Sequence, residues 1–325
     1  MRKWTRSVPS DLPAGTSYAR LRQRKGVGPR ADSLFALLAA GCGVLVLLVL
    51  AYMVFSTTRT ALPVFGKAGI SFVTSSQWDP NAGRFGILAF IYGTVITSII
   101  ALIIAVPLSV GIALFLTEYS PKRLRAPIGY AVDLLAAVPS VIYGLWGVFV
   151  LLPIFLQPVA KFLSKYLGFI PIFDGPASGL SYFGAGVILG IMITPIISAL
   201  CREVLSTVPT DDRHAAYALG ATRWEMIRQA VLPKSRGGII GAVMLGLGRA
   251  LGETIAVALL VGSVIKISPS VVQPGHTMAA VIANNFAEAD AETIQALVGI
   301  GVVLFAITIV INMAARAIVW RFSRI

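Results

Sequence analysis

Six long apolar runs, separated by polar segments, dominate the pattern of hydrophobic and polar positions along this chain. Each run exceeds the length of about 20 residues that a helix needs to cross the hydrocarbon core of a membrane, and is far longer than the roughly 9 to 11 residues of a membrane barrel strand. The pattern therefore predicts an all-α integral membrane protein with six transmembrane helices. The predicted spans are residues 33–56, 87–117, 127–152, 184–205, 238–265 and 296–318.

The composition and the placement of charge support this class. Hydrophobic residues make up 57% of the 325 residues and charged residues only 13%, whereas soluble domains carry about 25% charged residues. Of the 27 Lys and Arg residues, 20 fall in segments on the side of the N-terminus and 6 on the other side. This bias predicts that both termini are cytosolic. It also explains the net charge of +13 without nucleic acid, because no soluble domain is large enough to bind it.

The sequence divides into a tail, a first span and a larger membrane domain. Residues 1–32 are predicted to be a basic cytosolic tail that contacts anionic membrane lipid, and they are too long for a cleaved signal. The first transmembrane helix, residues 33–56, is followed by an extracytoplasmic loop over residues 57–86. Residues 87–320 hold the remaining spans, joined by a cytosolic loop over residues 207–237.

Two charged residues lie inside the fifth apolar run. A charge near the bilayer centre costs about 2.5 to 3.5 kcal/mol even on lenient scales, so Arg249 and Glu253 must face protein or water. Because they are four residues apart, we expect them on one helix face. They line a substrate path or form an ion pair that only holds the bundle together. Gly248 and Gly252 beside them are expected to permit close helix packing.

Other polar residues in the spans have simpler interpretations. Asp133 is expected to pair with a loop arginine. Thr94, Thr97 and Ser98 are expected to bond back to carbonyls of their own helix. Pro139 is expected to kink the third span.

No motif for catalysis or metal binding is present in the sequence. Cys42 and Cys201 fall in different spans, and His214 and His276 form no cluster, so we expect no metal site. Gly66-Lys67 lacks the preceding glycine of a phosphate-binding loop. The chain is therefore predicted not to be an enzyme and not to hydrolyse ATP itself.

The loop between the fourth and fifth spans is predicted to be structured. One helix begins near Asp211, and a second begins at Thr222, an N-cap with Glu225 at the third helical position. Pro233 and the glycines after it are expected to end this helix before the fifth span. The loop is a hairpin packed on its own membrane domain or a docking element for a partner.

The same loop resembles the coupling segment of ABC-importer permeases, in which two alanines, a glycine and a Leu-Pro pair have fixed spacings. The matching residues are Ala215, Ala216, Gly220, Leu232 and Pro233. His214 stands where that family has Glu, and Ala230 stands where it usually has Ile. The resemblance implies that these five residues couple the permease to an ATPase.

Three further segments are similar to permeases of phosphate importers, most of all to the PstC type: Trp78-Asp79-Pro80, Val138–Gly144 and Arg249–Thr254. The resemblance implies a type I ABC importer permease fold in the bacterial cytoplasmic (inner) membrane. It implies four partners, which are a homologous second permease (PstA type), a dimeric ATP-binding subunit (PstB type), an extracytoplasmic phosphate-binding protein (PstS type) and membrane lipid. It also implies no cofactor on this chain, since ATP and magnesium would be bound by the ATPase.

The chemistry of phosphate fits the two charges in the fifth span. A guanidinium stays protonated and pairs two phosphate oxygens at once, so Arg249 is expected to hold the anion and Glu253 to weaken that hold for release. We expect transport by alternating access. The alternatives are a permease for another oxyanion (sulfate, molybdate or phosphonate) and an ATP-independent anion channel.

Overall fold

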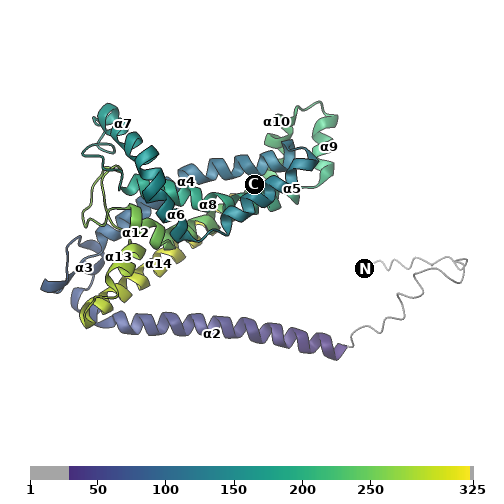
Figure 1. The fold of residues 1–325 in the computed structure, drawn as a ribbon. Helices are drawn as coiled ribbons and strands as arrows, with labels where there is room; N and C mark the ends of the chain where they lie inside the picture. The colour runs from purple at the N-terminus through teal and green to yellow at the C-terminus, as the bar shows by residue number, and fades with distance from the viewer. Residues whose placement is uncertain (1–28, 323–325) are drawn as a thin grey trace, which may run out of the picture. The chain divides into compact units, whose positions relative to one another are not determined.

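The computed structural model describes residues 29–322, so almost all of the predicted basic tail over residues 1–32 lies outside the described part of the chain. The described residues are nearly all helical (Figure 1). They belong to two compact units, Met1–Ser56 and Thr57–Ile325. Six helical stretches are long and apolar enough to cross a membrane, which confirms the predicted number.

The elements are short where the chain turns and long where it spans. The α-helices are α2 (Pro29–Ala68), α3 (Ser71–Thr74), α4 (Leu88–Leu114), α5 (Lys122–Ala136), α6 (Ser140–Trp146), α7 (Gln157–Leu167), α8 (Tyr182–Ser206), α9 (Thr210–Ala218), α10 (Arg223–Met226), α11 (Leu232–Gly252), α12 (Ile255–Leu260), α13 (Met278–Asn285) and α14 (Ala291–Phe322). The other elements are the π-helical segments η2 (Phe115–Tyr119), η3 (Gly147–Leu156) and η4 (Ile227–Val231), the 3-10 helix η1 (Pro80–Ala82), and the strands β1 (Trp78–Asp79) and β2 (Arg84–Phe85).

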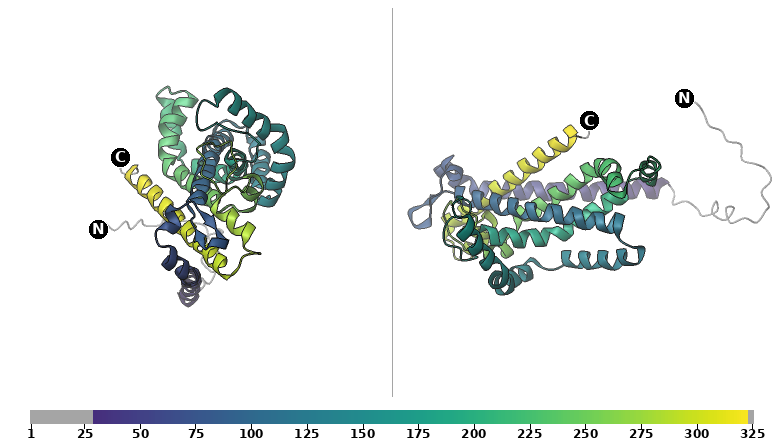
Figure 2. Two further views of the ribbon diagram at one scale, coloured as in Figure 1. Left: turned by 90° about the vertical axis from the view of Figure 1, so that its left-hand side faces the viewer. Right: turned by 90° about the horizontal axis from the view of Figure 1, so that it is seen from above.

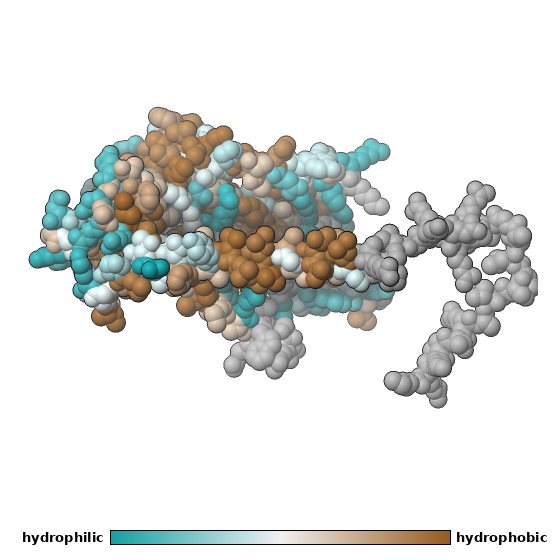
Figure 3. Space-filling view, turned by 90° about the horizontal axis from the view of Figure 1, so that it is seen from below, coloured by the Kyte–Doolittle hydropathy of each residue, from teal (hydrophilic) through white to brown (hydrophobic). Residues whose placement is uncertain are grey.

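The first unit is the N-terminal part of α2. Its apolar side chains are exposed along the helix, as expected for a helix whose surroundings are lipid, and they form the apolar surface of α2 in Figure 3. The helix continues to Ala68, although we predicted that a loop would begin at residue 57. Residues 57–68 include the poor helix formers Pro63 and Gly66, but Val64 and Phe65 pack in an apolar cluster that favours the helix. Gly69, with φ of +55°, ends it.

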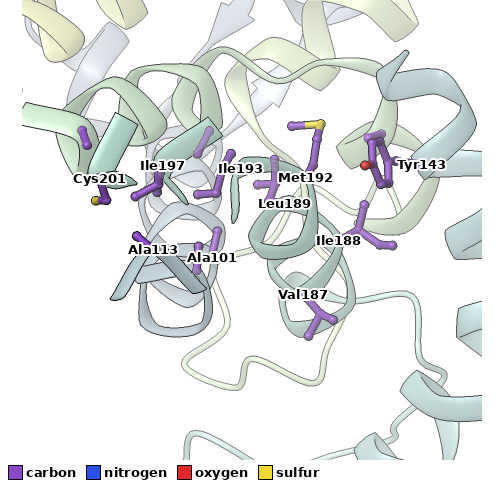
Figure 4. Packing of buried hydrophobic residues seen from close by; sticks show 14 of the residues in the cluster. Ala101, Ala113, Tyr143, Val187, Ile188, Leu189, Met192, Ile193, Ile197 and Cys201 are labelled. Atoms are coloured by element: carbon purple, nitrogen blue, oxygen red, sulfur yellow. The ribbon is translucent and has the colours of Figure 1, made fainter. Parts of the chain in front are cut away.

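Helices α4 and α8 pack along each other at the centre of the second unit. Small residues permit the close approach, as is usual between membrane helices: a Cβ added at Gly186 would stand 2.6 Å from Cβ of Ile100. Figure 4 shows Ala101 and Ala113 of α4 facing apolar side chains of α8, among them Ile197. These residues form a tightly packed core.

The third span differs from the prediction. We expected one kinked helix over residues 127–152, but α5 ends at Ala136 and a new helix begins at Ser140, directly after Pro139. The extended backbone of Pro139 breaks the helix because proline cannot donate the next hydrogen bond and crowds the preceding turn. The stretch that is long and apolar enough to cross a membrane is instead Ser140–Leu167.

A second apolar cluster closes one end of this unit. Strands β1 and β2 pair antiparallel with Trp78 opposite Phe85, and the Asp79 carboxylate accepts a hydrogen bond from the Ala82 amide in the turn that joins the strands. Phe72, Phe90 and other apolar side chains pack beneath this hairpin. Figure 2 shows α9 and α10 at the opposite end of the unit.

The segment between α12 and α13 folds back over the start of α8. The Ser181 amide donates to the Leu260 carbonyl at 2.9 Å, and the Phe183 amide donates to the Val271 carbonyl at 2.8 Å. Gly275 meets the Tyr182 ring so closely that an added Cβ would stand 1.9 Å from Cζ. Position 275 is therefore restricted to glycine by packing.

Candidate functional site

The fifth span begins inside the loop over residues 207–237, which we call the coupling loop because it resembles that segment of ABC-importer permeases. Residues 223–252 form one continuous helical stretch, so the prediction that Pro233 and the glycines after it break the chain was wrong. Pro233 lies in the first turn of α11, directly after the π-helical segment η4. A wider π turn relieves the clash between a proline ring and the preceding carbonyls. The second half of the coupling loop is thus rigidly joined to the fifth span.

The same span ends earlier than predicted, at Gly252. Glu253 has an extended backbone (φ −69°, ψ 131°), and α12 begins only at Ile255. The expectation that Arg249 and Glu253 share one face of a helix was therefore wrong. The cause is the helix end itself, since Glu253 no longer follows the helical repeat that would place it above Arg249.

Arg249 lies on an open face one turn before this end. Its side chain is exposed, and a Cβ added at Gly248 or Gly252 would meet no atom of the chain within 4 Å. The expected close packing at these glycines does not occur within the described chain, because they flank the same open face as Arg249.

Glu253 is in the opposite environment. Only 9% of the residue is exposed, and within residues 29–322 no ion pair or hydrogen bond joins it to Arg249. Helix α12, which follows it, packs on α6 so closely that a Cβ at Gly144 would stand 3.0 Å from Cα of Ala256. The two charges are therefore separated, with the cation exposed and the acid buried behind the helix end.

The other predicted polar contacts are found. Asp133 of α5 accepts two hydrogen bonds from Arg202 Nη2, at 2.8 and 2.9 Å. Thr94, Thr97 and Ser98 each donate to a carbonyl of their own helix. Thr94 also accepts a hydrogen bond from the Met278 amide at 2.9 Å, a tertiary contact that its spacing in the sequence did not reveal.

The coupling loop forms the two predicted helices. Helix α10 begins with the predicted capping box, in which Thr222 and Glu225 each accept a hydrogen bond from the other's backbone amide. Gly220 turns the chain between the helices with φ of +82°, a conformation that residues with a Cβ adopt with strain. Leu219 is 89% exposed and Trp224 is 57% exposed. These two side chains give the loop an apolar outer surface.

Ala215 and Gly220 are exposed on this surface, whereas Ala216 and Leu232 are half-buried and pack against the core. Pro233 is exposed at the start of α11. The five residues of the predicted coupling pattern therefore divide between the outer surface of the loop and its attachment to the fifth span.

The sequence did not reveal one ion pair and one buried histidine. Arg213 of α9 forms an ion pair with Glu118 of η2 at 3.0 Å, and no spacing rule joins residues 95 positions apart. His276 is 4% exposed, and this burial lowers the pKa of its imidazole to about 4. A cavity of about 270 Å³ lies elsewhere, beside Lys67, Arg84 and Glu292, and does not include Arg249.

Comparison with known proteins gives consistent matches. The family model described as "Binding-protein-dependent transport system inner membrane component" matches residues 105–324. The chain is 45% identical over 299 residues to the phosphate transport system permease protein PstC of Xylella fastidiosa (strain 9a5c), covering 91% of this chain and 92% of the relative. It is 38% identical over 277 residues to the probable PstC protein of Methanocaldococcus jannaschii, covering 83% and 86%.

Among solved structures, a chain of the bacterial alginate ABC transporter in complex with an alginate pentasaccharide-bound periplasmic protein is similar in fold. The TM-score is 0.61 at 19% sequence identity, covering 89% of this chain and 96% of that chain. At this level of identity the similarity concerns the fold alone.

Proposed function

The chain belongs to the family of binding-protein-dependent transport system inner membrane components, and from this premise we propose how it moves its substrate. It is the permease subunit of an ABC phosphate importer and a multi-pass inner-membrane protein. It is a transport subunit and not an enzyme. We propose that phosphate crosses by alternating access along a path that Arg249 lines.

One observation carries the proposed role of Arg249. An arginine that is exposed on an open helix face, within an apolar span and without an ion pair among the described residues, is costly unless water or an anion meets it. A guanidinium offers a planar set of donors that matches two oxygens of phosphate. Arg249 therefore supplies the positive charge that a phosphate ion needs to pass an apolar region.

Glu253 has a different proposed role. It is buried at the end of α11. Rotation of the short segment between α11 and α12 would bring its carboxylate toward Arg249. Such a movement would weaken the hold on phosphate, as release requires, because a site that binds too tightly does not pass its substrate on.

We propose that the loop over residues 207–237 docks on the ATPase through Leu219 and Trp224. The exposed apolar side chains there are unusual for a segment otherwise rich in charge. Ala215, Ala216 and Gly220 allow close approach, and Leu232 and Pro233 connect the loop to α11. His214 stands where the family has an acidic residue. This difference changes the charge of the docking surface and leaves its shape intact.

An ABC importer permease works with an ATPase and a binding protein. We propose that the specific partners here are a PstA-type permease, a dimeric PstB-type subunit that binds ATP and magnesium, and a PstS-type phosphate-binding protein. The proposed orientation has both termini in the cytosol, which puts the loop with α9 and α10 on the ATPase side. The hairpin of β1 and β2 then faces the binding protein.

The test is phosphate uptake in cells that lack their own phosphate importers and express this chain with its partner subunits. Radiolabelled phosphate uptake is measured with the wild type, Arg249→Gln and Arg249→Lys, each with and without excess unlabelled sulfate. We expect ATP-dependent uptake that sulfate does not inhibit. We expect it to collapse in Arg249→Gln and to recover in part in Arg249→Lys, which keeps the charge but loses the planar donors.

The outcomes separate the alternatives. Uptake that sulfate inhibits would favour another oxyanion as the substrate, and uptake that survives ATP depletion would favour a channel. Normal uptake in Arg249→Gln would show that this residue does not line the path. The amount of each variant in the membrane is the control.

A further inference from the structure

The coupling loop holds a nearly buried ion pair to a helix other than the two it connects. Arg213 Nη2 lies 3.0 Å from Glu118 Oε1, and these side chains are 17% and 8% exposed. Glu118 belongs to η2, the π-helical end of α4. By contrast, the Lys234–Asp212 pair in the same loop is 52% and 35% exposed. Exposed pairs of that kind contribute little, whereas breaking a buried one leaves a charge without compensation.

The same guanidinium also binds the end of α8. Arg213 Nη1 donates to the Val208 carbonyl at 2.5 Å, and Nη2 donates to the Leu205 carbonyl at 2.9 Å. These carbonyls lie at the helix end, where the helix itself provides no donors. One side chain of α9 thus holds α8 and α4 together.

The other half of the loop contacts the same π-helical turn. The guanidinium of Arg223, the first residue of α10, stands 5.1 Å from the centre of the Tyr119 ring, within the range of a cation–π interaction. Arg125 of α5 donates to the Thr117 carbonyl of η2 at 2.6 Å. Both helices of the coupling loop therefore hold η2, one by an ion pair and one by an aromatic contact.

We propose that Glu118 and Arg213 are positioning residues that transmit movement of the coupling loop to α4. The inference rests on the proposed function and deepens it, because it adds a third span to the two that the loop joins directly. A force applied at Leu219 and Trp224 reaches α8 and α11 through the chain, and it reaches α4 through the packing of α4 on these helices. The contacts with η2 join the loop to the end of α4 directly, with neither helix in between. The π turn is suited to this role, since its hydrogen bonds are less regular than those of an α-helix and such turns often mark functional positions.

The test compares phosphate transported with ATP hydrolysed in vesicles that hold the complete importer. Glu118→Gln removes the charge and keeps the size of the side chain. We expect ATP hydrolysis to continue while phosphate transported per ATP falls by about 5- to 150-fold, the usual range for coupling between sites. Glu118→Asp keeps the charge and is expected to recover part of the ratio. Asp212→Asn, which breaks the exposed pair in the same loop, is expected to leave the ratio unchanged.

The amount of phosphate transported per ATP hydrolysed distinguishes transmission of movement from a purely structural role. A structural role would lower the amount of assembled complex without changing this ratio. An assembled Glu118→Gln importer with the wild-type ratio would overturn the inference. If Glu118→Gln does not assemble, the double variant of Glu118→Gln and Arg213→Gln decides, because it leaves no buried charge unpaired: a lower ratio supports the inference and an unchanged one overturns it. Absence of uptake in wild-type vesicles would refute the proposed function and the inference with it.

Discussion

The contact between α4 and α8 predicts a large effect of one added methyl group at Gly186. In Gly186→Ala the new Cβ would stand 2.6 Å from both Cβ and Cγ2 of Ile100, and 3.2 Å from the Thr97 carbonyl oxygen. A Cβ atom cannot rotate away from its own backbone, so a change of rotamer does not relieve the contact. The two helices must therefore move apart along their most closely packed stretch.

Overpacking of this kind costs about 1 to 3 kcal/mol. Alanine in a helix interior recovers about 0.8 to 1 kcal/mol relative to glycine, so Gly186→Ala should destabilise the chain by up to about 2 kcal/mol. Gly111→Ala in α4 is the matched control, because its Cβ would meet no atom within 4 Å. Gly111→Ala should therefore gain only the free energy by which alanine is preferred to glycine in a helix. The difference between the two variants therefore isolates the overpacking term, at about 1 to 3 kcal/mol.

The assay is unfolding of the detergent-solubilised chain, followed by tryptophan fluorescence against temperature and denaturant. We expect the midpoint to fall in Gly186→Ala and to stay or rise in Gly111→Ala. Equal stability of the two variants would refute the reasoning, because it would mean that the helices separate without cost. Size-exclusion profiles establish that both variants remain monodisperse.

Three further predictions follow from single contacts. Burial lowers the pKa of His276 from 6.5 to about 4, so its neutral form stabilises the fold above pH 6.5. About 3 kcal/mol of the free energy of unfolding is lost as the pH falls through 4. His276→Leu should flatten this part of a stability–pH curve, and an unchanged slope would contradict the assignment. Gly220→Val should destabilise the loop by about 1 to 2 kcal/mol through its positive φ, and Gly220→Asn should cost less; equal thermal midpoints would exclude backbone strain. Asp133→Asn should change stability by no more than about 1 kcal/mol, because its pair with Arg202 is partly exposed; a larger loss in a denaturant titration would show that the pair is effectively buried.

Local patterns in the sequence were sufficient for much of the architecture. The number of spans follows from the length of the apolar runs, because lipid demands that each crossing segment satisfy its own backbone hydrogen bonds. The capping box at Thr222 and the back-bonded hydroxyls of α4 involve residues within four positions of one another, so spacing alone predicts them. The family followed from a loop whose residues keep a fixed spacing.

Only the tertiary structure decided where the charges lie. Arg249 and Glu253 are separated because the helix ends between them, although the sequence around them is apolar enough to continue it. Arg213 meets Glu118 because the fold brings α9 to the end of α8 and to η2, and so joins residues 95 positions apart. A helical repeat specifies which residues share a face, but the end of a helix and the partner of a distant charge depend on the free energy of packing the whole chain, which no local pattern contains.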